Sequence, residues 1–248
     1  MAKLVGVLNI TPDSFSDGGQ FVDPTAALRQ ATKLFDDGAS LVDVGAESTR
    51  PGAAPISTEV EWQRLLPVLQ QLIKRYPEQI SVDTYHPETV ERVLGLGDVI
   101  INDVTGMNDP AMVEAVVRHH ARCVISQLPA GDPQAAHHGE LIDDEQIIID
   151  NLLAKARLLQ KEGLPKDRII LDPGIGFGKT PRLNRELLGF AEKVPDYPVM
   201  IGYSRKRFLG DDRMELEPNL EAGRIAAAAG AAYLRVHDVA GHRPLLQA

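Results

Sequence analysis

The chain has 248 residues, of which 44% are apolar and 25% are charged. This is enough apolar material for one well-buried core, so we expect a single domain over residues 1–248. The formal net charge of −9, from 26 basic and 35 acidic side chains, argues against nucleic acid and anionic membranes as partners, and no apolar run is long enough to span a membrane.

Short runs rich in β-branched residues alternate with longer segments of helical periodicity, the pattern of parallel strands joined by crossover helices. In chain order, the predicted strands are Leu4–Asn9, Leu41–Val44, Ile80–Asp83, Val99–Asn102, Arg122–Ser126, Ile169–Asp172, Val199–Gly202 and Tyr233–Val236. The predicted helices between them are Pro24–Asp37, Thr58–Lys74, Pro87–Leu94, Pro110–His119, Asp143–Glu162, Arg182–Val194 and Leu220–Ala229. Prolines in first turns and glycines after helix ends agree with these bounds.

Eight strand-helix units favour an α/β fold closed into a single (β/α)8 TIM barrel, because the first strand-to-helix loop lacks the glycine fingerprint of an open dinucleotide-binding sheet. Catalytic groups of such barrels lie at the carboxyl ends of the strands. Polar residues occur at or just beyond these ends, namely Asn9, Glu47, Asp83, Asn102, Asp172, Ser204 and His237. Any one of them could instead be a structural cap or turn residue.

The last helix is predicted to be shortened, because only 12 residues follow Val236. In an eight-unit barrel this helix covers the outer face between the last and first strands, here near Val5, Val7, Tyr233 and Leu234. We therefore expect a second chain to cover this face, most simply in a homodimer, although a heteromeric partner would serve equally. Cys123 is the only cysteine, which excludes an internal disulfide and favours a reducing cytoplasm as the location.

Seven segments carry a resemblance that extends over nearly the whole chain. They are VLNITPDSFSDGG at 7–19, DVGAESTRPGA at 43–53, SVDTY at 81–85, INDVTG at 101–106, DPGIGFGKT at 172–180, GYSRKRFLG at 202–210 and RVHDV at 235–239. In sequence and in order, these segments resemble the motifs of the dihydropteroate synthase family. The resemblance implies a barrel that binds a pterin diphosphate, 4-aminobenzoate and Mg²⁺.

The pterin's aminopyrimidinone edge presents N–H donors beside acceptors, so its pocket needs buried carboxylates and an amide. Asp83, Asn102 and Asp172 meet this requirement, although the two aspartates could instead cap the following turns. The resemblance assigns these three residues to the pterin together with Lys206. It assigns the walls of the pterin pocket to Val104, Phe177 and Gly202.

The diphosphate needs converging cationic or dipolar donors on this acidic protein, and Arg50, Arg235 and His237 are the candidates. Arg235 and His237 are alternate residues at the end of one strand, which keeps them on one face. A lone arginine more commonly lies on a solvated surface. The resemblance adds Thr49 and Asn9, and makes Asn9 a ligand of Mg²⁺, whose coordination the diphosphate and water would complete.

The loops 11–19 and 46–57 are rich in Gly, Ser and Pro and have the character of catalytic lids. The resemblance implies that Asp13 stabilises a cationic pterin and acts in catalysis with Lys206, Arg235 and His237. It places 4-aminobenzoate against Phe15, Pro51, Phe177, Lys206 and Arg207. The glycines of GIGFGK at 174–179 do not have Walker-loop spacing and are interpreted as permitting close backbone approach.

Three features depart from the family pattern: Ser126-Gln127-Leu128 after the fifth strand, the pair Tyr203 and Arg207, and the short C-terminus. They motivate an alternative function, a pterin-binding paralogue with lost or reduced synthase activity that acts as a sensor or partner subunit. A pterin-dependent methyltransferase of the same superfamily is a third interpretation. It is disfavoured because methyl transfer needs no residues to hold a diphosphate.

Overall fold

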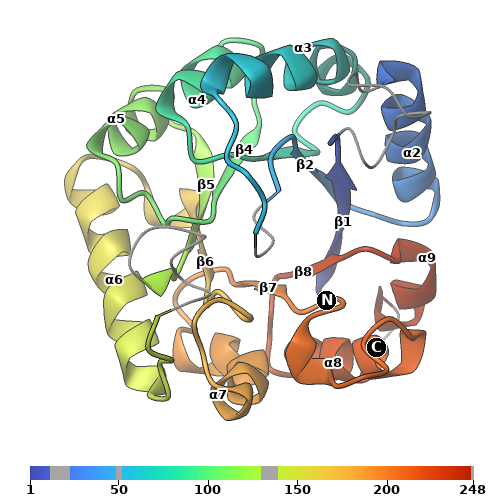
Figure 1. Ribbon diagram of the computed structural model, residues 1–248. Coiled ribbons are helices and arrows are strands. Elements are labelled where there is room, and N and C mark those ends of the chain that lie inside the picture. The colour runs from blue at the N-terminus through green and yellow to red at the C-terminus, as the bar shows by residue number, and fades with distance from the viewer. Residues whose placement is uncertain (12–22, 49–51, 130–138, 247–248) are drawn as a thin grey trace.

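The computed structural model describes residues 1–11, 23–48, 52–129 and 139–246, and its helices form a ring around a central sheet of parallel strands (Figure 1). The eight strands follow the order β6-β5-β4-β3-β2-β1-β8-β7. An isolated parallel bridge between Leu171 and Val199 joins β6 to the residue before β7 and brings the two edges of the sheet together. The predicted (β/α)8 barrel is therefore confirmed.

All eight predicted strands are present, and each predicted end lies within one residue of the observed one. The observed bounds are β1 (Lys3–Asn9), β2 (Leu41–Gly45), β3 (Ile80–Asp83), β4 (Ile100–Asp103), β5 (Arg122–Ser126), β6 (Ile169–Asp172), β7 (Met200–Gly202) and β8 (Tyr233–Val236). Burial on both faces of a parallel sheet explains why these strands could be recognised from their apolar, β-branched runs.

The helices of the described residues follow the prediction with two corrections. Their bounds are α2 (Pro24–Asp36), α3 (Thr58–Arg75), α4 (Pro87–Leu94), α5 (Pro110–Arg118), α6 (Glu145–Lys161), α7 (Pro181–Glu186), α8 (Leu216–Ala228) and α9 (Val239–His242), with 3₁₀ turns η3 (Lys166–Arg168), η4 (Leu187–Lys193), η5 (Arg207–Leu209) and η6 (Arg243–Leu246). The predicted helix Arg182–Val194 is wrong as one element: it tightens into η4, which contains the poor helix former Gly189. Helix α8 begins four residues before the predicted Leu220, because Pro218 falls in the first turn, where it gives up no helical hydrogen bond.

The inside of the barrel is apolar at its amino end and polar at its carboxyl end. A separate buried cluster fills the amino end, consisting of Val5, Leu41, Ile100, Val124, Ile170 and Met200 with Tyr233 packed against it. Because strand side chains alternate, residues two positions further along point into the same interior. This second layer contains Asp43, Asn102, Ser126, Asp172, Gly202 and Arg235. The alternation therefore directs these candidate functional residues toward the interior of the barrel.

The expectation of an uncovered outer face beside β1 and β8 is wrong. Leu234 is fully buried, and the tail residues Val239 and Leu245 are buried in the same core cluster. Helix α9 lies between α2 and α8 in the ring (Figure 1). A Cβ at Gly6 would lie 3.1 Å from both Leu34 and Val239, so this glycine lets α2 and α9 close over β1. The homodimer and the heteromeric partner therefore stay predictions. An uncovered outer face no longer supports them.

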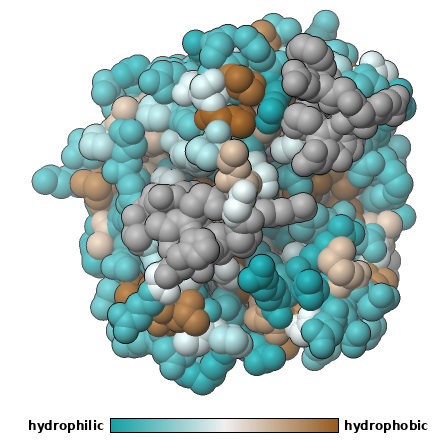
Figure 2. Space-filling view, viewed as in Figure 1, coloured by the Kyte–Doolittle hydropathy of each residue, from teal (hydrophilic) through white to brown (hydrophobic). Residues whose placement is uncertain are grey.

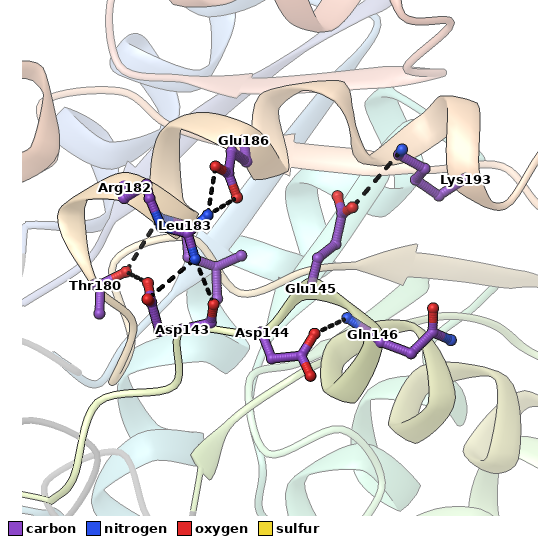
Figure 3. Close-up of polar contacts among 9 residues, drawn as sticks. All are labelled: Asp143, Asp144, Glu145, Gln146, Thr180, Arg182, Leu183, Glu186 and Lys193. Carbon is purple, nitrogen blue, oxygen red and sulfur yellow. Dashed lines mark hydrogen bonds and ion pairs between the residues drawn. The ribbon is translucent and has the colours of Figure 1, made fainter.

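Exposed hydrogen bonds and ion pairs connect the loop that precedes α6 to the start of α7 and the loop before it (Figure 3). Asp143 accepts a hydrogen bond from Thr180 and forms an ion pair with Arg182 at 3.0 Å, while Arg182 also pairs with Glu186 at 2.6 Å. Ile142 forms a parallel bridge with Lys179 beside these contacts. They position the end of the glycine-rich segment 174–179.

On the face viewed in Figure 2, hydrophilic side chains predominate and apolar ones occur in small separate groups. No helix in the described part of the chain is long and apolar enough to cross a membrane.

Candidate active site

Arg235 of β8 is the centre of an ionic network at the carboxyl end of the barrel. Its Nε donates to Asp43 Oδ2 at 2.7 Å, and its Nη2 donates to Asp83 Oδ2 at 2.8 Å. Asn102 Nδ2 also donates to Asp43 Oδ2, at 3.0 Å. The network therefore joins β2, β3, β4 and β8 and brings together three predicted site residues, Asp83, Asn102 and Arg235.

Asp43 is the member of this network that the sequence analysis did not assign. The side chain is completely buried, and its Oδ1 has no hydrogen-bond partner among the described residues. A signal for it was present, because Asp43 opens the DVGAESTRPGA segment and follows the inward-facing Leu41 by two residues. Its position inside a strand, not at the strand's end, hid it.

The electrostatics of this network are set by burial and by charges close together. Burial raises the pKa of Asp83 to about 7, with a further contribution from the neighbouring Asp43, although the positive charge of Arg235 acts in the opposite direction. Burial would lower the pKa of Arg235, but the two carboxylates outweigh it and raise that pKa. Arg235 therefore stays charged, while burial makes Asp83 easier to protonate than an exposed aspartate.

Asp172 of β6 and Lys206, which follows β7, form a second part of the site. Asp172 Oδ1 accepts from the backbone N–H of Gly174 at 2.7 Å. Lys206 Nζ donates to the carbonyl oxygen of Ile175 and lies 5.1 Å from the centroid of the Phe177 ring. Burial lowers the pKa of Lys206 to about 8, opposed by the charge of Asp172, while burial raises the pKa of Asp172, opposed by Lys206.

Gly202 connects the two parts of the site. A Cβ at this position would lie 3.8 Å from Lys206 Nζ and 3.9 Å from the Arg235 side chain. The predicted residues Asp172, Phe177, Gly202 and Lys206 are therefore close to Arg235 in one region of the barrel.

The glycine-rich segment after β6 is held in place by a buried lysine. Lys179 Nζ donates to the carbonyl oxygens of Gln127, Gly174 and Phe177, at 3.1, 2.8 and 3.0 Å. Gly174 has a φ of +68°, and a Cβ there would lie 2.1 Å from the Gln127 carbonyl oxygen. This contact agrees with the interpretation that the glycines permit close backbone approach. Lys179 has a structural role, because its hydrogen bonds hold the segment in place.

The remaining described candidates lie around this centre. The backbone N–H of His237 donates to the Ser204 hydroxyl oxygen at 3.3 Å, and the same oxygen lies 3.1 Å from His237 Nδ1. Asn9 is half-buried at the end of β1, and Val104 is buried just after β4. Arg207 is exposed in η5. The candidates Asp13, Phe15, Thr49, Arg50 and Pro51 lie outside the described residues.

The departures from the family pattern do not interrupt the ionic network. Gly202 faces the interior, so Tyr203 faces outward, where it is fully buried beneath α8. A Cβ at Gly223 of α8 would lie 2.4 Å from the Tyr203 hydroxyl, so a glycine is required there. Gln127 is buried, and its backbone nitrogen donates to the Asp172 carbonyl oxygen at 3.0 Å.

A barrel with buried carboxylates, an amide and cations gathered toward the carboxyl ends of its strands has the architecture of an enzyme that acts on a small polar ligand. The family model described as "Pterin binding enzyme" matches residues 5–237. Dihydropteroate synthase of Escherichia coli (strain K12) is 35% identical over 244 residues, which cover 95% of this chain and 86% of that protein. That of Bacillus subtilis (strain 168) is 36% identical, covering 95% of this chain and 83% of that protein.

Solved structures agree with these relatives. The dihydropteroate synthase of Xanthomonas albilineans with 4-aminobenzoic acid has a TM-score of 0.89 and 34% identity, covering 99% of this chain and 91% of that chain. The synthase of Burkholderia cenocepacia complexed with 7,8-dihydropteroate has a TM-score of 0.86 and 32% identity, covering 100% of this chain and 90% of that one. The chain belongs to the dihydropteroate synthase family of pterin-binding enzymes.

Proposed function

We propose that this chain condenses 6-hydroxymethyl-7,8-dihydropterin diphosphate with 4-aminobenzoate, giving 7,8-dihydropteroate and diphosphate in folate biosynthesis. The observation that carries the proposal is the ionic network in which Arg235 joins Asp43 and Asp83, with Asn102 bound to the same Asp43 oxygen. Chromatographic detection of dihydropteroate from the two substrates tests it. Binding of the pterin without product would contradict it.

The pterin is held through its hydrogen-bonding edge. Because Asn102 donates its amide N–H to Asp43, its carbonyl oxygen is left to accept an N–H of the pterin. Asp83 and Asp172 supply further acceptors for the ring, and Lys206 supplies a donor. Val104, Phe177 and Gly202 complete the walls. Asp43 is a positioning residue in this scheme, since it fixes the amide of Asn102 and the guanidinium of Arg235.

The reaction breaks the bond between the pterin methylene carbon and the diphosphate oxygen, and the bonding electrons leave with the diphosphate. The amine nitrogen of 4-aminobenzoate attacks the methylene carbon and releases a proton. Arg235 and His237 stabilise the departing negative charge, because hydrogen-bond donors held in place by the fold need little reorganisation during the reaction. Arg50, Thr49 and Asp13, outside the described residues, complete the proposed diphosphate and cation contacts.

The aminobenzoate pocket is proposed to consist of Phe15, Pro51, Phe177, Lys206 and Arg207. Support for it comes from the contact between the Lys206 ammonium and the Phe177 ring, which places a cation beside an aromatic surface. Arg207 is the next residue after Lys206 and lies in η5. Its exposed guanidinium offers an ion-pair partner for the carboxylate of 4-aminobenzoate.

Magnesium dependence is proposed through Asn9. The amide oxygen of Asn9 is a hard ligand at the carboxyl end of β1, and β1 pairs directly with β8, which carries Arg235. This donor fits Mg²⁺, which commonly takes few protein ligands and keeps water and phosphate oxygens. When bound, the ion would neutralise diphosphate charge.

The alternative, a paralogue without synthase activity that acts as a sensor or partner subunit, is not favoured by any feature of the described site. Three departures from the family pattern motivated it, and Tyr203, which belongs to one of them, faces outward beneath α8. We further propose a cytoplasmic location and a homodimer. Sedimentation across dilution tests the homodimer, and a monomer at all concentrations would contradict it.

A further inference from the structure

A second polar cluster lies where the loop after β2 meets α3 and α4, apart from the residues that we assign to the substrates. It consists of Glu47 after β2, Glu61 in α3 and His86, which precedes α4. One potential metal-binding atom from each residue lies within 4.8 Å of the others. Helices α3 and α4 are neighbours in the ring (Figure 1), so three separate elements bring these side chains together.

Glu61 provides a second, independent observation at this cluster. Its side chain is completely buried in α3. Oε2 accepts hydrogen bonds from Thr84 at 3.0 Å and Thr89 at 2.5 Å, whereas Oε1 has no partner in the described part of the chain. A buried carboxylate oxygen without a donor or a cation is unfavourable. The two threonines fix the carboxylate and leave Oε1 available.

Glu47 and His86 form the other half of the cluster. Glu47 Oε1 accepts from the Tyr85 hydroxyl at 2.5 Å, and Oε2 lies 2.9 Å from His86 Nε2. The His86 imidazole pairs with Glu47, whereas Glu61 forms no ion pair among the described residues. A bound cation would supply the positive charge that this buried carboxylate lacks.

We propose that Glu47, Glu61 and His86 form a binding site for a divalent transition-metal ion, with Zn²⁺ as the representative ion. Two carboxylates and one imidazole are the ligand set that such ions accept, with water in the fourth position, whereas the imidazole disfavours Mg²⁺. The site is therefore distinct from the proposed magnesium position at Asn9.

The dimensions of the cluster agree with this assignment after a small adjustment. With metal–ligand bonds of about 2.1 Å, ligand atoms of a tetrahedral site lie about 3.4 Å apart. The Glu47–His86 separation of 2.9 Å is already close to that, and the wider separations, of up to 4.8 Å, would shorten as Glu47 and His86 turn toward the fixed Glu61 carboxylate. Thr84, Thr89 and Tyr85 are the outer hydrogen-bond donors that orient such ligands.

The test is a calorimetric titration of the chelator-treated full chain with ZnCl₂, in the absence of pterin, diphosphate and magnesium, with metal content measured after dialysis. The variants are Glu61→Gln and His86→Gln. His119→Gln is the matched control, because His119 Nε2 lies 3.2 Å from a single carboxylate, that of Glu91, on an exposed surface. Asn9→Ala is the control for zinc binding at the proposed magnesium position.

We expect about one tightly bound zinc ion per chain, an affinity loss of at least about tenfold in Glu61→Gln and His86→Gln, and unchanged binding in both controls. His86 is partly exposed, so its variant is informative even if Glu61→Gln fails to fold. No stoichiometric zinc in the wild type, or equal affinity in His86→Gln, would overturn the proposal. So would loss of the zinc in Asn9→Ala.

Discussion

Replacing Asp43 by asparagine tests whether this buried carboxylate organises the pterin pocket. Asp43 Oδ2 accepts from both Arg235 and Asn102, and its side chain is fully buried. Breaking a buried ion pair costs about 3–5 kcal/mol, but Arg235 retains Asp83, so we expect a loss of about 1.5–3 kcal/mol in unfolding free energy, the scale of one hydrogen bond to a charged group. Because the amide of Asn102 loses its orientation, the KM for the pterin diphosphate should rise at least about tenfold.

Denaturant unfolding and steady-state kinetics measure the two effects of Asp43→Asn. Glu91→Gln is the matched control, since it removes the carboxylate of the exposed Arg118–Glu91 pair at 2.7 Å and should change stability by less than about 1 kcal/mol. If Asp43→Asn kept wild-type stability and a wild-type KM for the pterin, the positioning role of Asp43 would be refuted.

Four further outcomes follow from the site. Lys206→Ala, Asp172→Asn and Arg235→Ala should each lower turnover at least about tenfold while still folding, and near wild-type rates in any two would contradict the site assignment. Strong chelation should abolish turnover and excess Mg²⁺ should restore it; unchanged turnover would remove the ion from the mechanism. Since burial lowers the pKa of Lys206 to about 8, its positive charge is lost as the pH rises through that value, so kcat/KM should fall on the alkaline side. Lys206→Arg should remove this alkaline fall, and a fall that persists would assign it to another group. Tyr203→Phe should leave kcat unchanged and not lower the melting temperature, because the Tyr203 hydroxyl has no partner among the described residues; a large loss of activity would show that this tyrosine acts in the site.

The strands were predictable because a buried parallel strand has a simple sequence form. The run from Ile169 to Asp172, apolar and then acidic, shows both the strand and the carboxylate at its end. Helix ends were predictable where proline or glycine marked them, as at Pro87. The 3₁₀ segment η4 could not be predicted, because the spacing of its apolar residues is the same as that of a continued α-helix.

The candidate site was predictable where a polar residue ended a strand, as at Asp83, or matched a group of the expected ligands, as Asn102 and Arg235 do. It was missed where a carboxylate lay inside a strand. Asp43 belongs to the second kind, and only its contacts with Arg235 and Asn102 show its role. The coverage of the outer face could not be predicted either, because it depends on a close approach at Gly6, made between residues distant in the sequence.

Measuring the stoichiometry of the two products that the purified chain forms tests the proposed synthase reaction. Dihydropteroate and diphosphate should be measured together, with pterin diphosphate, 4-aminobenzoate and Mg²⁺ present and with each omitted in turn. We predict equal amounts of the two products, formed only with both substrates and greatly reduced in Arg235→Ala. Tight binding of the pterin with neither product formed would contradict the account and favour a binding protein without synthase activity.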